Sequence, residues 1–432
     1  MQSLQQKDKQ YIWHPYTSLL SPADPIPVVK GEGVYLIDEE GNRYLDAVSS
    51  WWVTIHGHAH PYIARKLYEQ ALQLEQVIFT QFTHRPAVEL AERLIGLLPG
   101  GFSKIFYSDN GSTAVEVAVK MALQYWWNKE PRPEQPPQRN QIIAFNKSYH
   151  GDTFGAMSLS DRSIFTLAFR DKLFEVIFID TPTAENIQAV QHTIIQQSPR
   201  IAAFIYEPLL QGAGGMNMYE AGLLDTLLAT CRRQGIICIA DEVLTGFGRT
   251  GSLFASEQMQ TKPHIICLSK GLTGGTMALG VTACNENITA AFKTTDRLKT
   301  FFHGHSFTAN PLACAAALAS LDLFTTEETM KQVKRIAEQH RGFALKISGH
   351  PAVKNMRTTG TILAFEYNTG SNTYLNNIGQ HITAFMLKRN IYLRTLGNTV
   401  YIMPPYCISA KELEQVYEAI EEYLSETMIK GL

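Results

Sequence analysis

Two short apolar runs, Ile236–Ala240 and Ile265–Leu268, constrain the fold of this 432-residue chain more than any other stretch. Both have the length of a strand and are apolar throughout, which is typical of strands buried on both faces of a parallel sheet. Both end abruptly in polar residues, with Asp241 after the first run and Lys270 shortly after the second. Open α/β sheets bind ligands just beyond the carboxyl ends of their strands. We therefore expect Asp241 and Lys270 to point into one crevice.

The chemistry of these two residues favours an aldehyde cofactor. A lysine in a partly desolvated site loses its proton readily and can form a Schiff base with an aldehyde such as pyridoxal phosphate (PLP). The ring nitrogen of that cofactor needs an acidic partner, which lets the ring accept electrons. Lys270 and Asp241 fit these roles. A surface lysine and a helix-capping aspartate are the structural alternative, and two residues alone do not decide between them.

The order of the predicted elements favours an α/β fold. Further strands are expected at residues 104–107, 141–145, 176–179, 201–205 and 280–284, mostly separated by helical segments. Such alternation predicts a doubly wound, mostly parallel sheet. Beyond residue 324 the elements become shorter and mixed, which is typical of a smaller α+β unit.

Composition excludes several classes of protein. The formal net charge is −2, so no electrostatic footprint favours nucleic acid. The longest apolar runs are too short to span a membrane, and the first ten residues are polar, without the apolar core of a signal peptide. The six cysteines form no close C-x-x-C pair, so neither a zinc site nor a disulfide framework is indicated. We expect a cytoplasmic protein without membrane association.

Other polar groups also follow predicted strands. Residues 108–114 (Ser-Asp-Asn-Gly-Ser-Thr-Ala) open a helix, where free N–H groups and the helix dipole can bind a phosphate, although serine and threonine are also ordinary helix caps there. Tyr149 follows a strand and could stack on a flat cofactor or simply pack in its loop. Glu207 stands at another carboxyl end.

A tryptophan pair and a histidine cluster lie near the N-terminus. Trp51 and Trp52 follow polar serines rather than an apolar run, so they could form a flat wall for a substrate as well as part of the core. His56, His58 and His60 have a spacing that could bind zinc, but no carboxylate or cysteine accompanies them. We predict a packed, hydrogen-bonded loop and no metal site.

Together these motifs resemble the class III (subgroup III) aminotransferases, which are PLP enzymes of fold type I. The run from Ala240 to Gly251, Ala-Asp-Glu-Val-Leu-Thr-Gly-Phe-Gly-Arg-Thr-Gly, followed by Lys270, is similar to that subgroup's motif. The resemblance covers nearly the whole chain. It implies an N-terminal segment (1–50) belonging to the small domain, a large PLP-binding domain (51–323) and a C-terminal small domain (324–432).

The resemblance also implies roles for individual residues. Lys270 would bind the cofactor covalently and then carry a proton between carbon atoms, Asp241 would hold the ring nitrogen, and Tyr16 would be a third catalytic residue. The remaining implied cofactor contacts are Tyr149 stacked on the ring, Gly111 and Ser112 at the phosphate, Glu207 beside the ring, and Ser306 reaching the phosphate from a partner subunit.

Four shorter runs are similar to the branch of this family that acts in biotin biosynthesis: Trp13–Thr17, Ser50–Trp52, Tyr149–Thr153 and Tyr401–Tyr406. This resemblance implies that Arg394 pairs with a substrate carboxylate through its fork of donors. Arg249 would either bind substrate or brace its loop. The implied substrate-binding residues are Trp51, Trp52, Tyr16, Tyr149, Gly304, Arg394 and Tyr401.

The implied reaction is a ping-pong transfer of an amino group to the 7-keto group of 8-amino-7-oxononanoate, giving 7,8-diaminononanoate. S-adenosylmethionine is the expected donor. The loop His303-Gly304-His305-Ser306 departs from the His-Gly-Pro-Thr of well-known users of that donor and is similar to relatives that use lysine, so lysine is the alternative. Because Ser306 would act across an interface, a homodimer with shared active sites is implied.

Three further readings compete with this function. One is an isomerase of the glutamate-1-semialdehyde type, which shares the lysine but not the tryptophan pair. The chain could be another class III transaminase acting on an ω-amino acid, although those usually lack the tandem tryptophan and the Met-Pro-Pro-Tyr run at residues 403–406. It could also be a PLP-binding homologue without activity.

Overall fold

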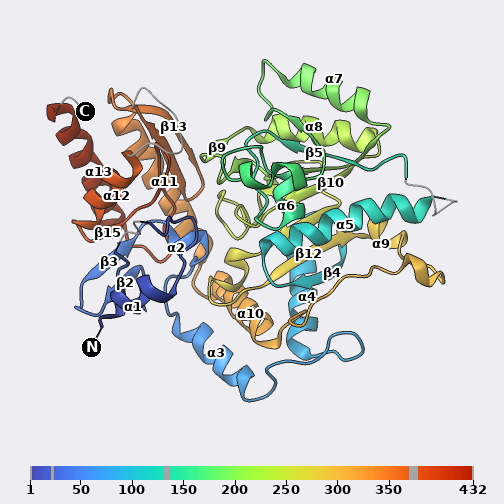
Figure 1. Ribbon diagram of the computed structural model, residues 1–432, viewed down its shortest axis with the longest axis horizontal. Helices are drawn as coiled ribbons and strands as arrows, with labels where there is room; N and C mark the ends of the chain where they lie inside the picture. Colours follow the sequence, from blue (N-terminus) through green and yellow to red (C-terminus); the bar gives the residue numbers. More distant parts are fainter. Residues whose placement is uncertain (1, 21–23, 131–136, 369–377, 431–432) are drawn as a thin grey trace.

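A seven-stranded sheet forms the centre of the computed structural model, which describes residues 2–20, 24–130, 137–368 and 378–430 (Figure 1). Across the sheet the strands are β4 (Phe102–Ser108), β12 (Gly280–Asn285), β11 (Ile265–Leu268), β10 (Ile237–Asp241), β7 (Ile201–Tyr206), β5 (Gln141–Phe145) and β6 (Val176–Ile179). The strands from β11 to β6 pair in parallel, and β12 is antiparallel to both of its neighbours. The prediction of a mostly parallel α/β sheet is confirmed.

Helices cover both faces of this sheet because its strands are apolar on both. Along β10, Ile237 and Ile239 pack in one cluster with helix α5 (Gly111–Lys129), whereas Cys238 and Ala240 pack in another with helix α8 (Ala221–Arg233). Strand residues alternate between the two faces of a sheet, so each apolar strand supplies both clusters. A strand buried on both faces can carry polar groups only at its ends, which is where Asp241 lies.

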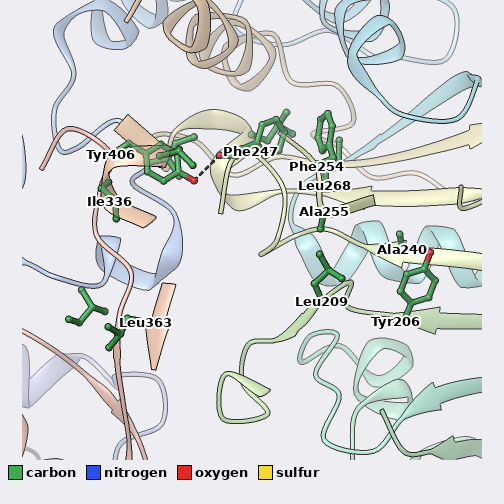
Figure 2. Packing of buried hydrophobic residues seen from close by; sticks show 14 of the residues in the cluster. Tyr206, Leu209, Ala240, Phe247, Phe254, Ala255, Leu268, Ile336, Leu363 and Tyr406 are labelled. Atoms are coloured by element: carbon green, nitrogen blue, oxygen red, sulfur yellow. Dashed lines mark hydrogen bonds between the residues drawn. The ribbon is translucent and has the colours of Figure 1, made fainter. Parts of the chain in front are cut away.

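The larger hydrophobic cluster runs from the sheet into the C-terminal part of the chain. Figure 2 shows Ala240 beside Tyr206 on the sheet side, with Phe247 between the sheet and Tyr406. The Tyr406 hydroxyl donates a hydrogen bond of 2.8 Å to the Phe247 carbonyl oxygen (Figure 2). Apolar packing and this buried hydrogen bond together fix the loop after β10 against the C-terminal residues.

The C-terminal part contains a second, antiparallel sheet. Its strands in order are β13 (Val353–Thr359), β14 (Ile362–Tyr367), β17 (Thr399–Ile402) and β16 (Thr395–Leu396). The helices that accompany it are α11 (Thr329–Ile347), α12 (Ile378–Leu387) and α13 (Ala410–Lys430). This is the α+β character that the sequence predicted beyond residue 324.

The N-terminal strands join the C-terminal part through a third sheet. It contains β1 (Val28–Glu32), β2 (Tyr35–Asp38), β3 (Arg43–Asp46) and β15 (Ile391–Tyr392), and β15 pairs in parallel with β3. In Figure 1 these blue strands lie beside the red C-terminal elements. The division into domains at residues 50 and 323 stays a prediction, and residues 1, 21–23, 131–136, 369–377 and 431–432 of those ranges lie outside the described residues.

The remaining elements precede or link the strands of these sheets. They are α1 (Leu4–Tyr11), α2 (Ser49–Trp52), α3 (Pro61–Ala71), α4 (Arg85–Leu97), α6 (Phe154–Leu159), α7 (Ile187–Gln197), α9 (Glu286–Ala290), α10 (Pro311–Thr326) and the short pair β8 (Leu210–Gln211) and β9 (Asn217–Met218), with 3₁₀ turns η1 (Leu167–Lys172), η2 (Ala255–Gln258), η3 (Lys270–Thr273) and η4 (Arg297–Lys299). Within the described ranges, no helix has both the length and the apolar character of a membrane span.

Candidate active site

A cavity of about 610 Å³ lies at the carboxyl ends of β10 and β11. Asp241 and Lys270 both line it, so the two residues share one crevice as the strand pattern predicted. The cavity brings together most of the other residues expected at the site, and their roles stay predictions. These residues are Tyr16, Trp51, Trp52, Gly111, Ser112, Tyr149, Glu207 and Arg394.

Lys270 opens the 3₁₀ turn η3, two residues after β11 ends. Its φ of 45° lies in the left-handed region, which non-glycine residues seldom adopt and which is common at functional sites. Its Nζ lies 4.6 Å from the centroid of the Trp52 ring. Burial lowers the pKa of the Lys270 ammonium from 10.5 to about 8, although the carboxylates of Asp241 and Glu207 act in the opposite direction. A lysine with this pKa is partly neutral near physiological pH and can act as a nucleophile.

Asp241 is fixed by two hydrogen bonds at the end of β10. Its Oδ1 accepts the backbone N–H of Val243 at 3.1 Å, and its Oδ2 lies 2.7 Å from Nδ1 of His150. A carboxylate can only accept, so Nδ1 of His150 carries the hydrogen. His150 is a residue that the sequence reasoning missed, although it stands inside the run Tyr149–Thr153. Its Nε2 is buried without a hydrogen-bond partner in the described part of the chain.

Glu207 directly follows β7 and lines the cavity together with Tyr149. Its Oε1 accepts the Tyr149 backbone N–H at 3.0 Å, and its Oε2 accepts the Gly212 N–H at 3.0 Å. Burial, aided by the nearby charge of Asp241, raises the pKa of Glu207 to about 7, although His150 and the two backbone hydrogen bonds act in the opposite direction. The carboxyl group therefore ties the loop that carries Tyr149 to the loop after β8.

Each tryptophan of the tandem pair has a cation over its ring. The guanidinium carbon of Arg394 lies 4.5 Å from the centroid of the Trp51 ring, and Lys270 Nζ lies over Trp52. A cation over the face of an indole is attracted by the ring's quadrupole. Tyr16 completes the aromatic wall at 5.7 Å from Trp51, and its hydroxyl donates to Asp152 at 2.6 Å.

The start of helix α5 also lines the cavity. Asn110 caps the helix by accepting the Thr113 N–H at 3.0 Å, which leaves the N–H groups of Gly111 and Ser112 at the positive end of the helix dipole. A Cβ on Gly111 would lie 2.7 Å from Val243, so only glycine fits there. The first turn of α5 can bind an anion such as a phosphate.

These residues fit PLP. The lysine amine can take the aldehyde, the carboxylate of Asp241 can hold the ring nitrogen, and the first turn of α5 can hold the phosphate. All three groups line one cavity, and Tyr149 supplies an aromatic wall. The hydrogen bond from His150 also fits PLP, because it fixes the orientation of the Asp241 carboxylate that would hold the ring nitrogen.

Three of the expected residues lie elsewhere. Gly304 and Ser306 line a different cavity of about 680 Å³, together with Gln76 and Ile78. Tyr401 is 1% exposed and, in the described structure, lies behind the cavity wall rather than in it, where its hydroxyl accepts the Trp52 indole N–H at 3.0 Å.

Arg249 lies outside the cavity and braces its surroundings. Its Nη1 donates to the Pro404 carbonyl oxygen at 2.9 Å, and its guanidinium lies 5.0 Å from the Tyr406 ring centroid. Of the two roles considered from the sequence, these contacts favour bracing the loop.

The three clustered histidines turn to three different partners. His56 Nε2 lies 3.0 Å from the hydroxyl of Ser320, His58 Nε2 lies 3.0 Å from Asp46, and His60 Nε2 lies 3.1 Å from Glu327. Divergent rings do not converge on one ion, so these contacts agree with a packed, hydrogen-bonded loop.

The fold and the cavity define a PLP-dependent transferase of fold type I. The family model described as aminotransferase class-III matches residues 20–424. The chain belongs to the class III aminotransferase family, whose members are PLP-dependent aminotransferases.

Similar proteins include enzymes named for one reaction of that family. The adenosylmethionine-8-amino-7-oxononanoate aminotransferase of Synechococcus elongatus is 44% identical over 426 residues, which cover 96% of this chain and 99% of the relative. The protein of the same name from Geobacter sulfurreducens is 38% identical, covering 98% of this chain and 97% of the relative.

Solved structures share the whole fold. The crystal structure of adenosylmethionine-8-amino-7-oxononanoate aminotransferase from Methanocaldococcus jannaschii matches with a TM-score of 0.91 at 33% identity, covering 97% of this chain and 98% of that one. The omega transaminase from Pseudomonas jessenii in complex with PMP also matches with a TM-score of 0.91, at 27% identity, covering 99% and 98%.

The lowered pKa of Lys270 gives a testable reactivity. In cofactor-free protein, the rate of modification of Lys270 by trinitrobenzenesulfonate should rise with a midpoint near pH 8, because only the neutral amine reacts. Asp241→Asn should move that midpoint to lower pH, because it removes a negative charge that stabilises the ammonium. Peptide mass spectrometry measures both, and Lys346, whose pKa is raised by Glu421, serves as the internal control. A Lys270 midpoint near that of Lys346 would contradict the assignment.

Proposed function

We propose that this aminotransferase acts in biotin biosynthesis and transfers an amino group to the 7-keto group of 8-amino-7-oxononanoate, giving 7,8-diaminononanoate. The proposed donor is S-adenosylmethionine, and lysine is the alternative. The substrate is an acid whose reacting carbonyl is separated from its carboxylate by an aliphatic chain. The site must therefore hold an anion, an apolar chain and a reacting carbon in one cavity.

The arrangement of the tandem tryptophans carries this proposal. Adjacent rings of one wall face the two cations of the cavity, with Arg394 over Trp51 and Lys270 over Trp52. Arg394 can bind a carboxylate through its fork of donors, and the indole faces can cover an aliphatic chain. The reacting carbonyl carbon of the substrate must lie beside Lys270. The names of the relatives at 44% and 38% identity support the same substrate.

The residues of this chain divide the work of the reaction. When bound, PLP supplies the aldehyde that takes up the amino group and the ring that accepts an electron pair. Lys270 holds the cofactor and then, as a neutral amine, moves a proton at its Nζ. Asp241, oriented by His150, holds the ring nitrogen, and Tyr149 covers the ring. Trp51 and Trp52 exclude water along the substrate chain.

A second copy of the chain is part of the proposal. Gly304 and Ser306 lie in a cavity apart from Lys270, so they can reach a phosphate at Gly111 and Ser112 only from another subunit. Ile78 lines that second cavity, Phe302 and Phe307 stand next to its lining residues in the chain, and all three side chains are exposed. Such side chains are typical of a surface that is covered by a partner.

The proposed reaction is tested by offering the PLP-loaded protein 8-amino-7-oxononanoate with S-adenosylmethionine or with lysine. Formation of 7,8-diaminononanoate, followed by mass spectrometry, should occur with one of these donors and be absent in Lys270→Ala. Turnover of ω-amino acids with no diamine formed would favour the ω-transaminase alternative. The structural similarity to the Pseudomonas jessenii omega transaminase is the reason to test it. A cofactor absorbance band that no donor shifts would indicate a PLP-binding homologue without activity.

Arg394 gives a second prediction. Arg394→Ala should raise the KM for 8-amino-7-oxononanoate by about tenfold to a hundredfold, because a charge-assisted pair with the carboxylate contributes roughly 1.5–3 kcal/mol. The KM for the amine donor should change far less. Steady-state kinetics with each substrate varied in turn measures both values. Comparable losses for the two substrates would remove Arg394 from this role.

The proposed dimer predicts a mass of two chains in sedimentation. Phe307→Asp should shift the protein toward a single chain and reduce activity, because it buries an unpaired charge at the interface. Leu345→Asp is the matched control, because Leu345 on α11 is an exposed apolar residue like Phe307. It should leave the mass at two chains. A wild-type mass of one chain would contradict the shared active site.

A further inference from the structure

The turn that carries the tryptophan pair has an unusual backbone. Ser49, Ser50 and Trp52 have φ values of 53°, 59° and 69°, in the left-handed region. None of them is glycine, asparagine or aspartate, so the conformation is costly and needs support from its surroundings. Within the turn, Ser50 also has a ψ of −102°, far from any helical value. Something outside the turn must hold it.

Asp46, the last residue of β3, lies directly beside this turn. It is 0% exposed, and its carboxylate collects three hydrogen-bond donors. Oδ1 accepts the Val48 backbone N–H at 3.0 Å. Oδ2 accepts the Ser50 backbone N–H at 2.5 Å and lies 3.0 Å from Nε2 of His58. Hydrogen bonds to an ionised acceptor are among the stronger ones in proteins, so this carboxylate can hold a strained backbone.

Two further hydrogen bonds connect the tryptophan turn to the C-terminal part of the chain. The Ser49 hydroxyl donates to the Met403 carbonyl oxygen at 2.8 Å, and the Trp52 indole donates to Tyr401. Asp46 is also the register partner of Tyr392 in the pairing of β3 with β15, two residues before Arg394. One buried residue therefore lies at the junction of the strand that leads to Trp51 and the strand that leads to Arg394.

We propose that Asp46 is a positioning residue for acceptor binding. It touches no substrate, since in the described structure it does not line the cavity. It fixes the turn that presents Trp51 and Trp52, and through them the wall against which the acceptor's aliphatic chain lies. This inference rests on the proposed function for the identity of the acceptor.

Asp46→Asn tests the proposal with little change in size. An amide has one acceptor oxygen, so it cannot accept both the Val48 and the Ser50 N–H groups in this geometry. In single half-reactions followed by cofactor absorbance, the apparent Kd for 8-amino-7-oxononanoate should rise at least tenfold. The limiting rate should fall less than threefold, because Lys270 and Asp241 are untouched.

Asp38→Asn is the matched control. Asp38 is also buried in the same N-terminal sheet, at the end of β2, and its carboxylate accepts the Glu40 and Asn42 backbone N–H groups at 3.0 and 2.8 Å. It supports a hairpin turn rather than the tryptophan turn, so its Kd and rate should stay within twofold of wild type. A Kd within twofold for Asp46→Asn, or an equal rise for Asp38→Asn, would overturn the proposal.

Two further measurements keep the proposal testable. If Asp46→Asn does not fold, variants of His58 test the proposal instead. His58→Leu should raise the Kd for 8-amino-7-oxononanoate at least threefold. His58→Gln keeps a donor for Asp46, so its Kd should lie within twofold of wild type. Equal values for the two variants would count against Asp46.

Near-ultraviolet circular dichroism separates this proposal from the proposed function. Asp46→Asn, but not Asp38→Asn, should change the tryptophan bands even without substrate. A wild-type protein that does not react with 8-amino-7-oxononanoate, combined with this change, would reject the function while retaining the role of Asp46 in the turn. An unchanged spectrum for Asp46→Asn would reject that role.

Discussion

Desolvation of one amine is the constraint on which the rest of the structure depends. Lys270 can serve as a nucleophile only if its ammonium form is destabilised, which burial achieves. The same burial must still leave room in the cavity for the carboxylates that take part in the reaction. Asp241 and Glu207 share the cavity and oppose part of the shift, which keeps the pKa near 8. The fully apolar β10 and β11 make this balance possible, because they exclude water up to the point where the polar residues begin.

The site is assembled from parts of the chain that are distant in sequence. The carboxyl ends of β10 and β11 supply Asp241 and Lys270, the turn after β3 supplies Trp51 and Trp52, and the C-terminal part supplies Arg394. Two of these side chains are held by hydrogen-bonding neighbours: His150, which also lines the cavity, holds Asp241, and Tyr401, which does not line it, holds Trp52. The chemistry at the cofactor and the recognition of substrate thus rest on different supports.

The sequence predicted the elements whose signals are local. Apolar runs located the strands of the central sheet to within one or two residues, and the polar residues at their ends located Asp241 and Lys270. Contacts between distant segments gave no such signal. The bond from His150 to Asp241 and the position of Tyr401 behind Trp52 depend on packing across the fold, and short strands such as β8 and β9 carry too few residues for a periodic pattern.

The pairing of β3 with β15 joins residue 46 to residue 392. During synthesis on the ribosome, the nascent chain presents the tryptophan turn early and the strand leading to Arg394 only near the end. The central sheet can collapse while the C-terminal fifth is still being made, because its strands lie between residues 102 and 285. The part of the cavity that would bind the substrate carboxylate is therefore the last to be completed. A prematurely terminated chain would retain Lys270 but lack β15, the strand that pairs with β3 and leads to Arg394.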